Sequence, residues 1–523
     1  PIFSPDGSKI AFISNRFGNN DLFTIDTSGS LPKRLTYHSA SDTLSDWTAN
    51  DQLLFSSVRN YQQVEWDSEI HSVGINGGTP LRFLNAFGNE ATVSADGTMV
   101  AFVRGACRVD REAYRGAANK DIWIYHRKNK TYHQLTRFDG QDFHPVWDGD
   151  QLFFISARDG KYNVYKMAVN PDGSRNGDVK RISRFNDDSV RWISVSRSSD
   201  TIVLEKGTRL YRLAKDGQKF EKIEVQIGAD YRFDPVVKKS YRSNATEFRV
   251  SPNGKLIAFV VNGEIFLTEN RKEAGVTHNL SRHPFRDQDI AWLDNHSLIF
   301  SSDRSGNFDL YLVRSKDPEE KNLFKTMKRE VVKIAGSAEE ETNPIISPDG
   351  SKIAYTVGIG RLVTASIDKN GIISRKNALL DGWSTPMGVV FSPDSRWLAY
   401  ALEDLNFNSE IFIQPVDGKH DPVNVSMHPR GDFSPTWSRD GSKLAFLSAR
   451  HNRDDDIWFV WLKKSDWQKT KAEWDDEANQ SKKKSAAKKP SASKKSNSAG
   501  KDKKKTVIKP IHIDLQGIHE RVV

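Results

Sequence analysis

A phrase that recurs ten times constrains the fold of this chain more than any other feature. It reads Ser-Pro-Asp-Gly, then two or three residues, then a short apolar strand. The clean copies start at Ser4 and Ser347, the near copies at Ser94, Ser251, Ser392 and Ser438, and degenerate copies lie around Thr48, Asp148, Arg197 and Asp294. Successive copies are 43 to 54 residues apart, and a period in the forties with several strands per unit is typical of β-propeller blades.

Each repeat has the chemistry of a turn followed by strands. Pro sets the second turn position, Asp caps the turn, and Gly takes the position with positive φ. A β-rich run follows, then a polar turn, then a second strand such as Asp21-Leu22-Phe23, and many repeats end in Leu-Thr or Leu-Ser. About four strands per repeat predict one propeller blade each.

The number of repeats predicts two all-β domains in tandem. Ten blades exceed the ~4–8 blades of one propeller. We expect a first propeller over 1–230 and a second over 231–523, with the break in the stretch 231–246, where blade signals are few. Because the chain starts inside a blade and no closing blade follows the fifth blade of the second propeller, we expect both rings to be incomplete. A final strand is expected at Ile511-His512-Ile513-Asp514.

The net charge of +9 comes from one segment. Residues 481–505 contain eleven Lys and one Asp, so the remainder of the chain sums to −1. We expect a disordered, solvated insertion over 470–505 and no nucleic acid partner, with a phosphate- or anionic-surface-binding arm as the alternative. Cys107 is the single cysteine, which excludes an intrachain disulfide. No apolar run reaches the ~18 residues of a membrane span.

Signatures of catalysis are absent from the sequence. The nearest stretch to Gly-x-Ser-x-Gly is Gly382-Trp383-Ser384-Thr385-Pro386, which lacks the second Gly of a nucleophile elbow. The sequence contains neither His-Glu-x-x-His nor a Walker phosphate loop, and its histidines have no metal-ligand spacing. We therefore expect no catalytic residue, no metal and no cofactor within these 523 residues.

An insertion in the third blade carries the candidate binding residues. It covers residues 107–119, and Arg108, Arg111 and Arg115 fall within eight residues of each other. Guanidinium groups are forked donors that match a carboxylate. The alternative is that these arginines pair with Asp110 and Glu112 inside the insertion.

Several stretches resemble the N-terminal half of the tricorn protease family. The matching stretches are residues 31–37, 113–119 with 121–123, 145–150 with 153–156, 251–254 with 263–266, and 513–523. The likeness covers nearly the whole chain. Its more specific parts are the Tyr114-Arg115-Gly116 phrase, the tandem order, and the ending Ile518-His519-Glu520-Arg521; the Lys-rich insertion has no counterpart in the family pattern.

The resemblance implies a six-bladed propeller without its first blade, then a seven-bladed propeller without its last blades. It implies a serine-type peptidase that degrades short peptides, with propellers that gate substrate entry and product exit and a catalytic domain beyond the C-terminus. It also implies that Arg115, and Arg111 second, bind the carboxylate of the substrate. Peptide substrates, a homo-oligomer formed through the missing domains and a cytoplasmic location follow from it; because the N-terminus is missing, a periplasmic or exported protein stays open.

Two other classes of protein remain as alternatives. A non-catalytic TolB-like interaction module would have one propeller after a smaller α/β domain. A prolyl-oligopeptidase-like enzyme would have one propeller followed by Gly-x-Ser-x-Gly. The reading frame after Val523 discriminates them, because a protease domain there favours the tricorn interpretation and a stop codon favours the binding module.

Overall fold

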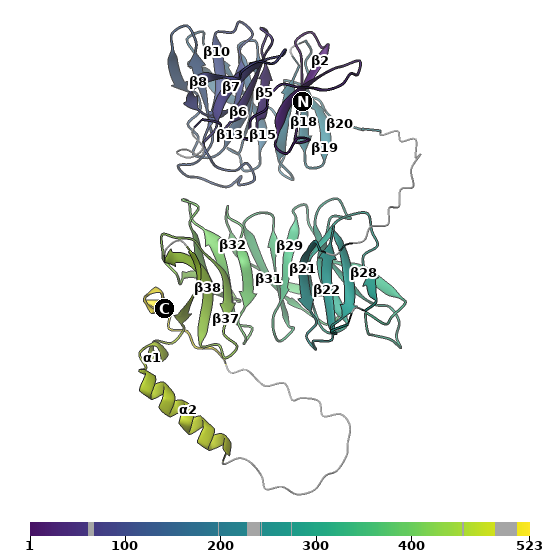
Figure 1. Ribbon diagram of the computed structural model, residues 1–523, viewed down its shortest axis with the longest axis vertical. Coiled ribbons are helices and arrows are strands. Elements are labelled where there is room, and N and C mark those ends of the chain that lie inside the picture. Colours follow the sequence, from purple (N-terminus) through teal and green to yellow (C-terminus); the bar gives the residue numbers. More distant parts are fainter. Residues whose placement is uncertain are drawn as a thin grey trace. The chain divides into compact units, whose positions relative to one another are not determined.

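The structure is a computed structural model that describes residues 1–60, 67–196, 198–226, 241, 243–273, 275–451, 454–486 and 510–523. The chain divides into two compact units, Pro1–Lys238 and Lys239–Val523. Nearly all regular structure in both units is β-strand, drawn as arrows in Figure 1. The prediction of two tandem all-β domains built of four-stranded blades is therefore confirmed.

In its described residues, unit 1 contains five antiparallel sheets, and each sheet is formed by four strands that follow one another in the chain. In chain order the strands of these sheets are β1 (Ile2–Phe3), β2 (Lys9–Ser14), β3 (Asp21–Asp26) and β4 (Lys33–Arg34); β5 (Thr43–Trp47), β6 (Gln52–Ser57), β7 (Glu69–Gly74) and β8 (Leu81–Phe87); β9 (Asn89–Val93), β10 (Met99–Arg104), β11 (Asp121–His126) and β12 (Thr131–Gln134); β13 (Asp142–Asp148), β14 (Gln151–Ser156), β15 (Asn163–Val169) and β16 (Arg175–Arg181); β17 (Val190–Val195), β18 (Ile202–Lys206), β19 (Arg209–Leu213) and β20 (Phe220–Ile223).

The part of unit 2 that the structure describes contains four sheets of four strands and a last sheet of three. Its strands are β21 (Ala245–Val250), β22 (Leu256–Val261), β23 (Glu264–Glu269) and β24 (Thr277–Asn279); β25 (Asp287–Trp292), β26 (Ser297–Ser302), β27 (Asp309–Ser315) and β28 (Arg329–Ala335); β29 (Glu341–Ile346), β30 (Lys352–Val357), β31 (Arg361–Ile367) and β32 (Ile373–Asp381); β33 (Met387–Phe391), β34 (Trp397–Glu403), β35 (Ser409–Pro415) and β36 (Val423–Asn424); β37 (Asp432–Trp437), β38 (Lys443–His451) and β39 (Asp454–Trp461). Among the described residues, helices α1 (Lys464–Trp467), α2 (Lys471–Ala486) and η1 (Ile518–Arg521) follow.

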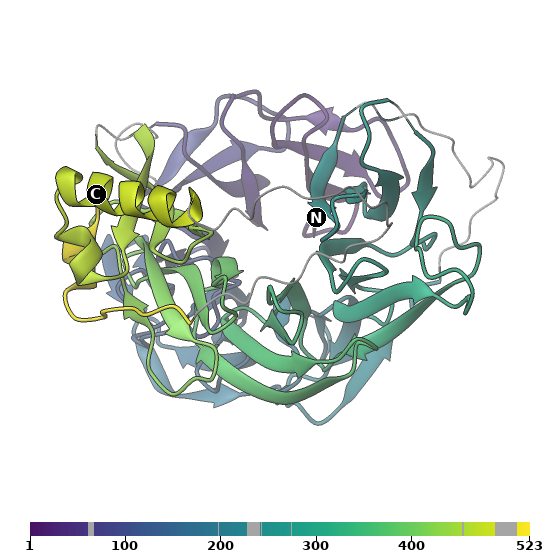
Figure 2. The same cartoon turned by 90° about the horizontal axis from the view of Figure 1, so that it is seen from below.

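We number the ten sheets as blades 1 to 10 in chain order. Within each unit the first strand of a blade lies beside the first strand of the next blade, as β5, β9, β13 and β17 do. The first strands are therefore the inner strands and the fourth strands the outer ones. Figure 2 shows the blades of unit 2, in teal to green, following one another around a common centre.

The repeated turn has the geometry that its sequence predicts. In the first copy Asp6 accepts hydrogen bonds from the Ser4 hydroxyl at 2.6 Å and from the Ser8 amide at 3.0 Å, and Gly7 has a φ of 71°. The Ser4 hydroxyl in turn accepts the Lys9 amide at 2.9 Å, which starts β2. These hydrogen bonds hold the pKa of Asp6 at about 2, below its usual value.

The hydrophobic core lies between successive blades. Buried side chains of neighbouring blades form shared clusters, for example Leu54 and Phe102 of blades 2 and 3. Tryptophans at the ends of inner strands connect one blade to the previous one, because the Trp147 indole donates to Thr92 O at 3.3 Å and the Trp292 indole to Arg249 O at 3.0 Å. Each blade thus depends on its neighbour for burial.

The last sheet corrects a prediction about its fourth strand. Ile511–Asp514 are not a strand; instead Val522 forms an antiparallel bridge with Val460, and Val523 and Phe459 exchange backbone hydrogen bonds of 2.8 and 3.1 Å. Ile511 and Ile513 pack against the core of blades 9 and 10. Val507–Lys509, which the sequence also predicts to belong to the returning strand, lie outside the described residues.

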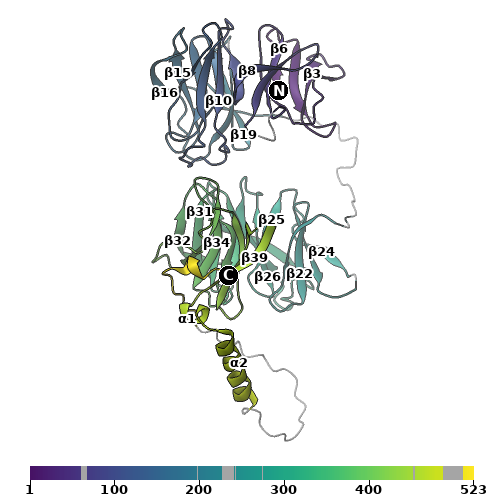
Figure 3. The same ribbon diagram turned by 60° about the vertical axis from the view of Figure 1, so that its left-hand side comes forward.

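Part of the Lys-rich segment expected to be disordered is helical. The helix α2 covers Lys471–Ala486, and α1 and α2 follow β39 as Figure 3 shows. Thr470 and Glu473 form a capping box, in which the Thr470 amide and hydroxyl donate to Glu473 Oε2 at 2.7 and 2.9 Å. Helix-forming Lys, Ala and Glu residues follow this cap, which explains why this part of the segment is helical. Residues 487–509 lie outside the described residues.

Candidate functional site

The insertion of blade 3 is a closed loop between β10 and β11. At its base the Cys107 amide donates to Ala118 O at 2.9 Å. Gly105 has a φ of 127°, and a Cβ there would lie 2.0 Å from Asn119 O. The two ends of the loop are thus held together so closely that only glycine fits at position 105.

The Tyr114-Arg115-Gly116 phrase is explained by packing. Tyr114 is fully buried, and its hydroxyl accepts the Ala118 amide at 3.3 Å. A Cβ on Gly116 would lie 2.5 Å from that hydroxyl. The glycine therefore leaves the room in which the tyrosine ring folds back over its own loop.

Arg115 connects this loop to blade 4. Its Nη1 donates to Glu112 O at 3.0 Å and to Tyr114 O at 2.8 Å, and its Nη2 donates to Ala157 O at 3.3 Å. A guanidinium has five N–H donors, so Nε–H and one Nη2–H remain without an acceptor among the described residues. The geometry gives Arg115 a structural role and leaves one edge of its guanidinium able to bind a carboxylate.

The other charged side chains of the loop are placed differently. Arg108 pairs with Asp110 at 2.6 Å and is mostly exposed. Glu112 lies 3.3 Å from Arg191 of β17 and 3.7 Å from Lys161, so it connects the loop to later blades. Arg111, the second predicted binding residue, is half-buried in the same loop.

Buried polar groups surround the base of the loop. Burial raises the pKa of the Cys107 thiol and of the Tyr162 phenol. The Tyr162 hydroxyl and Gln141 Nε2 are buried without a hydrogen-bond partner among the described residues. The thiol is therefore protonated and shielded, which makes Cys107 a poor nucleophile.

A buried arginine–aspartate pair anchors the turn next to this loop. Arg158 donates to Asp142 at 2.8 Å and to the Ser156 hydroxyl at 2.8 Å, and Asp142 is completely buried. The same pairing recurs in three other blades, as Arg59–Asp42, Arg304–Asp287 and Arg450–Asp432. In each of these blades the arginine also lies over the ring of the phenylalanine four residues earlier.

The sequence carried a signal for these pairs that our sequence analysis missed. It is Phe-x-Ser-x-Arg across the end of the second strand, with a buried Asp at the start of the first strand of the same blade. Copies of the signal start at Phe55, Phe154, Phe300 and Phe446, and Phe12 starts the same Phe-x-Ser-x-Arg phrase without an Asp in the first strand of its blade.

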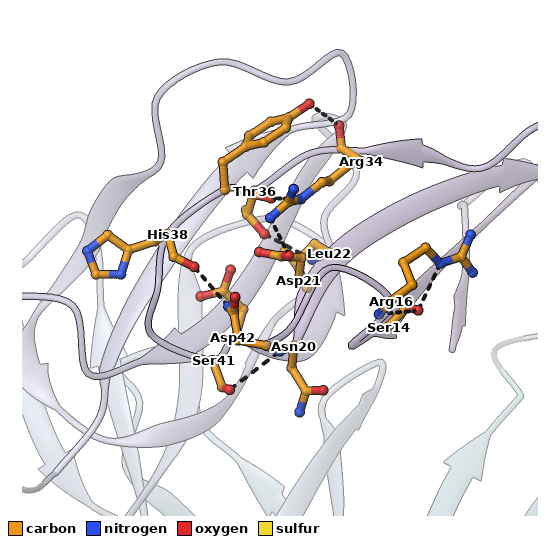
Figure 4. Close-up of polar contacts among 12 residues, drawn as sticks. Ser14, Arg16, Asn20, Asp21, Leu22, Arg34, Thr36, His38, Ser41 and Asp42 are labelled. Atoms are coloured by element: carbon orange, nitrogen blue, oxygen red, sulfur yellow. Dashed lines mark hydrogen bonds and ion pairs between the residues drawn. The ribbon is translucent and has the colours of Figure 1, made fainter.

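The other repeated polar contacts join the third strand to the end of the blade. Figure 4 shows them in blade 1, where the Leu22 amide donates to the Thr36 hydroxyl at 2.9 Å and Arg34 donates to buried Asp21 at 2.6 Å. In blade 3 the Ile122 amide and Thr136 make the same contact at 2.9 Å. This contact explains why Leu-Thr recurs at the ends of blades.

A hollow of about 180 Å³ lies between blades 3 and 4. It is lined by Thr136, Arg137, Phe138, Arg158, Arg175 and Val179. The Phe138 ring lies between two guanidinium groups, at 4.9 Å from that of Arg115 and 5.4 Å from that of Arg158. We call these residues the arginine hollow; its position was not predicted.

Ser384 lies in the turn between β32 and β33, is 5% exposed, and accepts the Glu403 amide at 3.3 Å, so it has neither the exposure nor the setting of a nucleophile. Within the described part of the chain, no group of three or more His, Cys, Asp or Glu side chains is placed to hold a metal ion. Among the described helices, none is long and apolar enough to cross a membrane.

Known proteins resemble this chain in sequence across both units. Residues 1–219 match the family model described as the tricorn protease N-terminal beta propeller domain. A tricorn protease homolog of Saccharolobus solfataricus is 24% identical over 463 residues, which are 86% of this chain and 40% of the relative. Tricorn protease homolog 1 of Streptomyces coelicolor is 24% identical over 471 residues, 86% of this chain and 41% of the relative. The crystal structure of the tricorn protease aligns with 100% of this chain and 48% of that chain, at 17% identity and a TM-score of 0.41.

The fold defines a protein made of two tandem β-propeller units. The sequence matches confirm its resemblance to the tricorn protease family, whose N-terminal propeller model covers most of unit 1. The chain spans about two fifths of the length of these two curated relatives.

Proposed function

We propose that this chain is the propeller region of a tricorn-like serine peptidase that degrades short peptides. The observation that carries the proposal is the match of unit 1 to the tricorn N-terminal propeller, together with a second propeller unit that follows it in the chain. The residues that cleave the peptide are proposed to lie outside this chain, in the same polypeptide. A cytoplasmic location and assembly into a homo-oligomer belong to the same proposal.

In this proposal the propellers guide peptides in and products out along their inner strands. Inner-strand side chains such as Trp192, 38% exposed on β17, and Met387, 44% exposed on β33, offer apolar contacts to a peptide. The His144 ring lies 5.7 Å from that of Trp192 and contacts Ile193 O at 2.9 Å, which fixes the wall between blades 4 and 5. Arg115 and Arg111 are proposed to bind the peptide carboxylate.

The experiment that tests the peptidase is a comparison of two purified proteins. One is this 523-residue chain, and the other is the product of its full reading frame. We expect the longer protein alone to hydrolyse fluorogenic short peptides, with activity lost on treatment with a serine-directed phosphofluoridate. Hydrolysis by the 523-residue chain, or none by the longer protein, would contradict the proposal.

The guiding role has a separate test in the longer protein. Trp192→Cys, labelled with a bulky maleimide, should slow peptide turnover relative to the same unlabelled variant. Cys107 is 1% exposed with a raised pKa, so it should not compete for the reagent. Unchanged turnover after complete labelling would show that peptides do not pass the inner strands of unit 1.

A non-catalytic propeller module that binds proteins is the second candidate. It would account for a chain without a catalytic signature, and the two-protein comparison distinguishes it, since neither protein would then hydrolyse peptides.

A further inference from the structure

We propose that the arginine hollow between blades 3 and 4 is an oxyanion-binding site for a phosphate or carboxylate group. None of its six lining residues is acidic, and three are arginines, Arg137, Arg158 and Arg175. Three guanidinium groups around one small hollow create a positive potential that an anion would neutralise. The inference concerns binding by this chain alone and does not depend on the proposed peptidase function.

The charges of the three arginines are not equally compensated. Arg158 is paired with completely buried Asp142, so its charge is balanced from inside the blade. Arg137 and Arg175 are exposed, and neither has a hydrogen-bond or ion-pair partner for its side chain among the residues that the structure describes. Two uncompensated guanidinium groups therefore face the hollow from different blades.

The repeat does not require an arginine at the position of Arg137. Arg137 follows the Leu-Thr end of blade 3, and the same position holds Arg184 in blade 4 and Arg282 in blade 6 but Tyr37 in blade 1 and Met427 in blade 9. The Tyr37 hydroxyl donates to Arg34 O at 3.1 Å, so in blade 1 this position serves the blade itself. An arginine at this position is therefore not required by the fold of a blade.

Size and lining restrict the ligand. At about 180 Å³ the hollow is smaller than the roughly 300–1,000 Å³ of sites for drug-sized molecules. Phe138 and Val179 add apolar surface to its lining. Guanidinium forks bind phosphate and carboxylate in the same bidentate way, so both oxyanions fit its chemistry.

The test is calorimetric titration of the 523-residue chain with three probes. They are inorganic phosphate, N-acetyl-leucine, and its neutral analogue N-acetyl-leucinamide. We expect binding of at least one anion, no binding of the amide, and weaker binding at high NaCl, as for any charge-assisted contact. Tighter binding of phosphate would identify a phosphate site, and tighter binding of N-acetyl-leucine a carboxylate site.

The variants locate the site. Arg137→Ala and Arg175→Ala should each weaken anion binding by about tenfold, and the double variant should abolish it. Arg184→Ala is the matched control, because Arg184 occupies the same repeat position in blade 4, is exposed, and does not line the hollow. Its removal changes the net charge equally and should leave binding unchanged.

Two results would overturn the inference. One is the absence of binding for both anions at low salt. The other is binding that Arg184→Ala weakens as much as Arg137→Ala does, since the anion would then respond only to net charge. Thermal unfolding of each variant checks that exposed Arg137 and Arg175 are not needed for folding.

Discussion

The guanidinium of Arg115 lies 4.9 Å from the ring centre of Phe138, and this contact joins the insertion of blade 3 to the turn that leads into blade 4. Gly140 makes the contact possible, because a Cβ there would lie 2.5 Å from the Phe138 ring and 2.7 Å from Arg115 Nη1. The Nη1 group is saturated by two loop carbonyls, whereas Nε–H stays without an acceptor among the described residues. Arg115 can therefore hold the loop and still present one edge to a ligand.

If that edge binds a peptide carboxylate, Arg115→Ala in the full-length enzyme should lower kcat/KM about tenfold more for a peptide acid than for its amide. Arg111→Ala should have the same preference with a smaller effect. Arg108→Ala is the control, because Arg108 is paired with Asp110 and mostly exposed. Equal losses for acid and amide, together with a lower Tm, would show that Arg115 acts only by holding the loop.

Arg158→Ala should lower the free energy of unfolding of unit 1 by about 3 kcal/mol, because it leaves the buried Asp142 carboxylate without its ionic partner. Arg181→Ala removes a partner of Asp159 from an exposed pair in the same blade and should cost less than about 1 kcal/mol. Urea unfolding of the two variants measures the difference. Similar costs would mean that the Asp142 pair does not anchor the blade.

The blades could be predicted from the sequence because their signals are local. The turn that starts at Ser4 is closed by Asp6 and Gly7 within five residues, so its chemistry is visible in a short window. The last sheet could not be predicted in this way. Ile511 and Ile513 alternate as in a strand, but they pack on the core of blades 9 and 10, and Val522 bridges Val460 instead.

In the candidate site, too, contacts that are local in sequence could be predicted and contacts between distant residues could not. The Phe-x-Ser-x-Arg signal would have found Arg158, because the Ser156 contact is local and Asp142 begins the same blade. The arginine hollow has no such signal, since Arg137 and Arg175 come from different blades and meet only because those blades pack together. The binding roles of Arg111 and Arg115 stay predictions.

The raised pKa of Asp121 predicts that the stability of unit 1 depends on pH. Burial is the main cause that raises the pKa of this carboxyl from 3.8 to about 6, and nearby Asp142 adds to it. Because the folded state holds the proton more tightly than the unfolded state, the destabilising contribution is absent below pH 3.8, grows between pH 3.8 and 6, and is complete above pH 6. The Tm of the native chain relative to Asp121→Asn should therefore fall as pH rises through this window.

The difference between the two proteins isolates Asp121, since the other carboxyl groups titrate in both. A constant difference from pH 4 to 7 would show that the pKa of Asp121 is not raised in the folded chain.

The hydrogen bonds of Arg521 fix the C-terminal segment against the last sheet. Its side chain is 2% exposed and donates to Trp461 O at 2.9 Å, to Gln516 O at 3.2 Å, to Leu462 O at 3.4 Å and to Asp514 O. Arg521→Ala would leave several buried carbonyls without a donor, at a cost of about 3 kcal/mol to unit 2.

The same change should release the hydrogen bonds between Val523 and Phe459, so their amides should exchange with solvent faster while those of β37 keep their protection. His519 is exposed in the same short helix η1, so His519→Ala should leave the stability of unit 2 and the exchange of these amides unaltered. Arg521→Lys keeps the charge but loses the planar set of donors, so its effect on stability and amide exchange should lie between those of Arg521→Ala and His519→Ala. If Arg521→Ala left the exchange of Val523 and Phe459 unchanged, the bridge between Val522 and Val460 would have to be held by packing of Ile518 and Val522 rather than by the arginine.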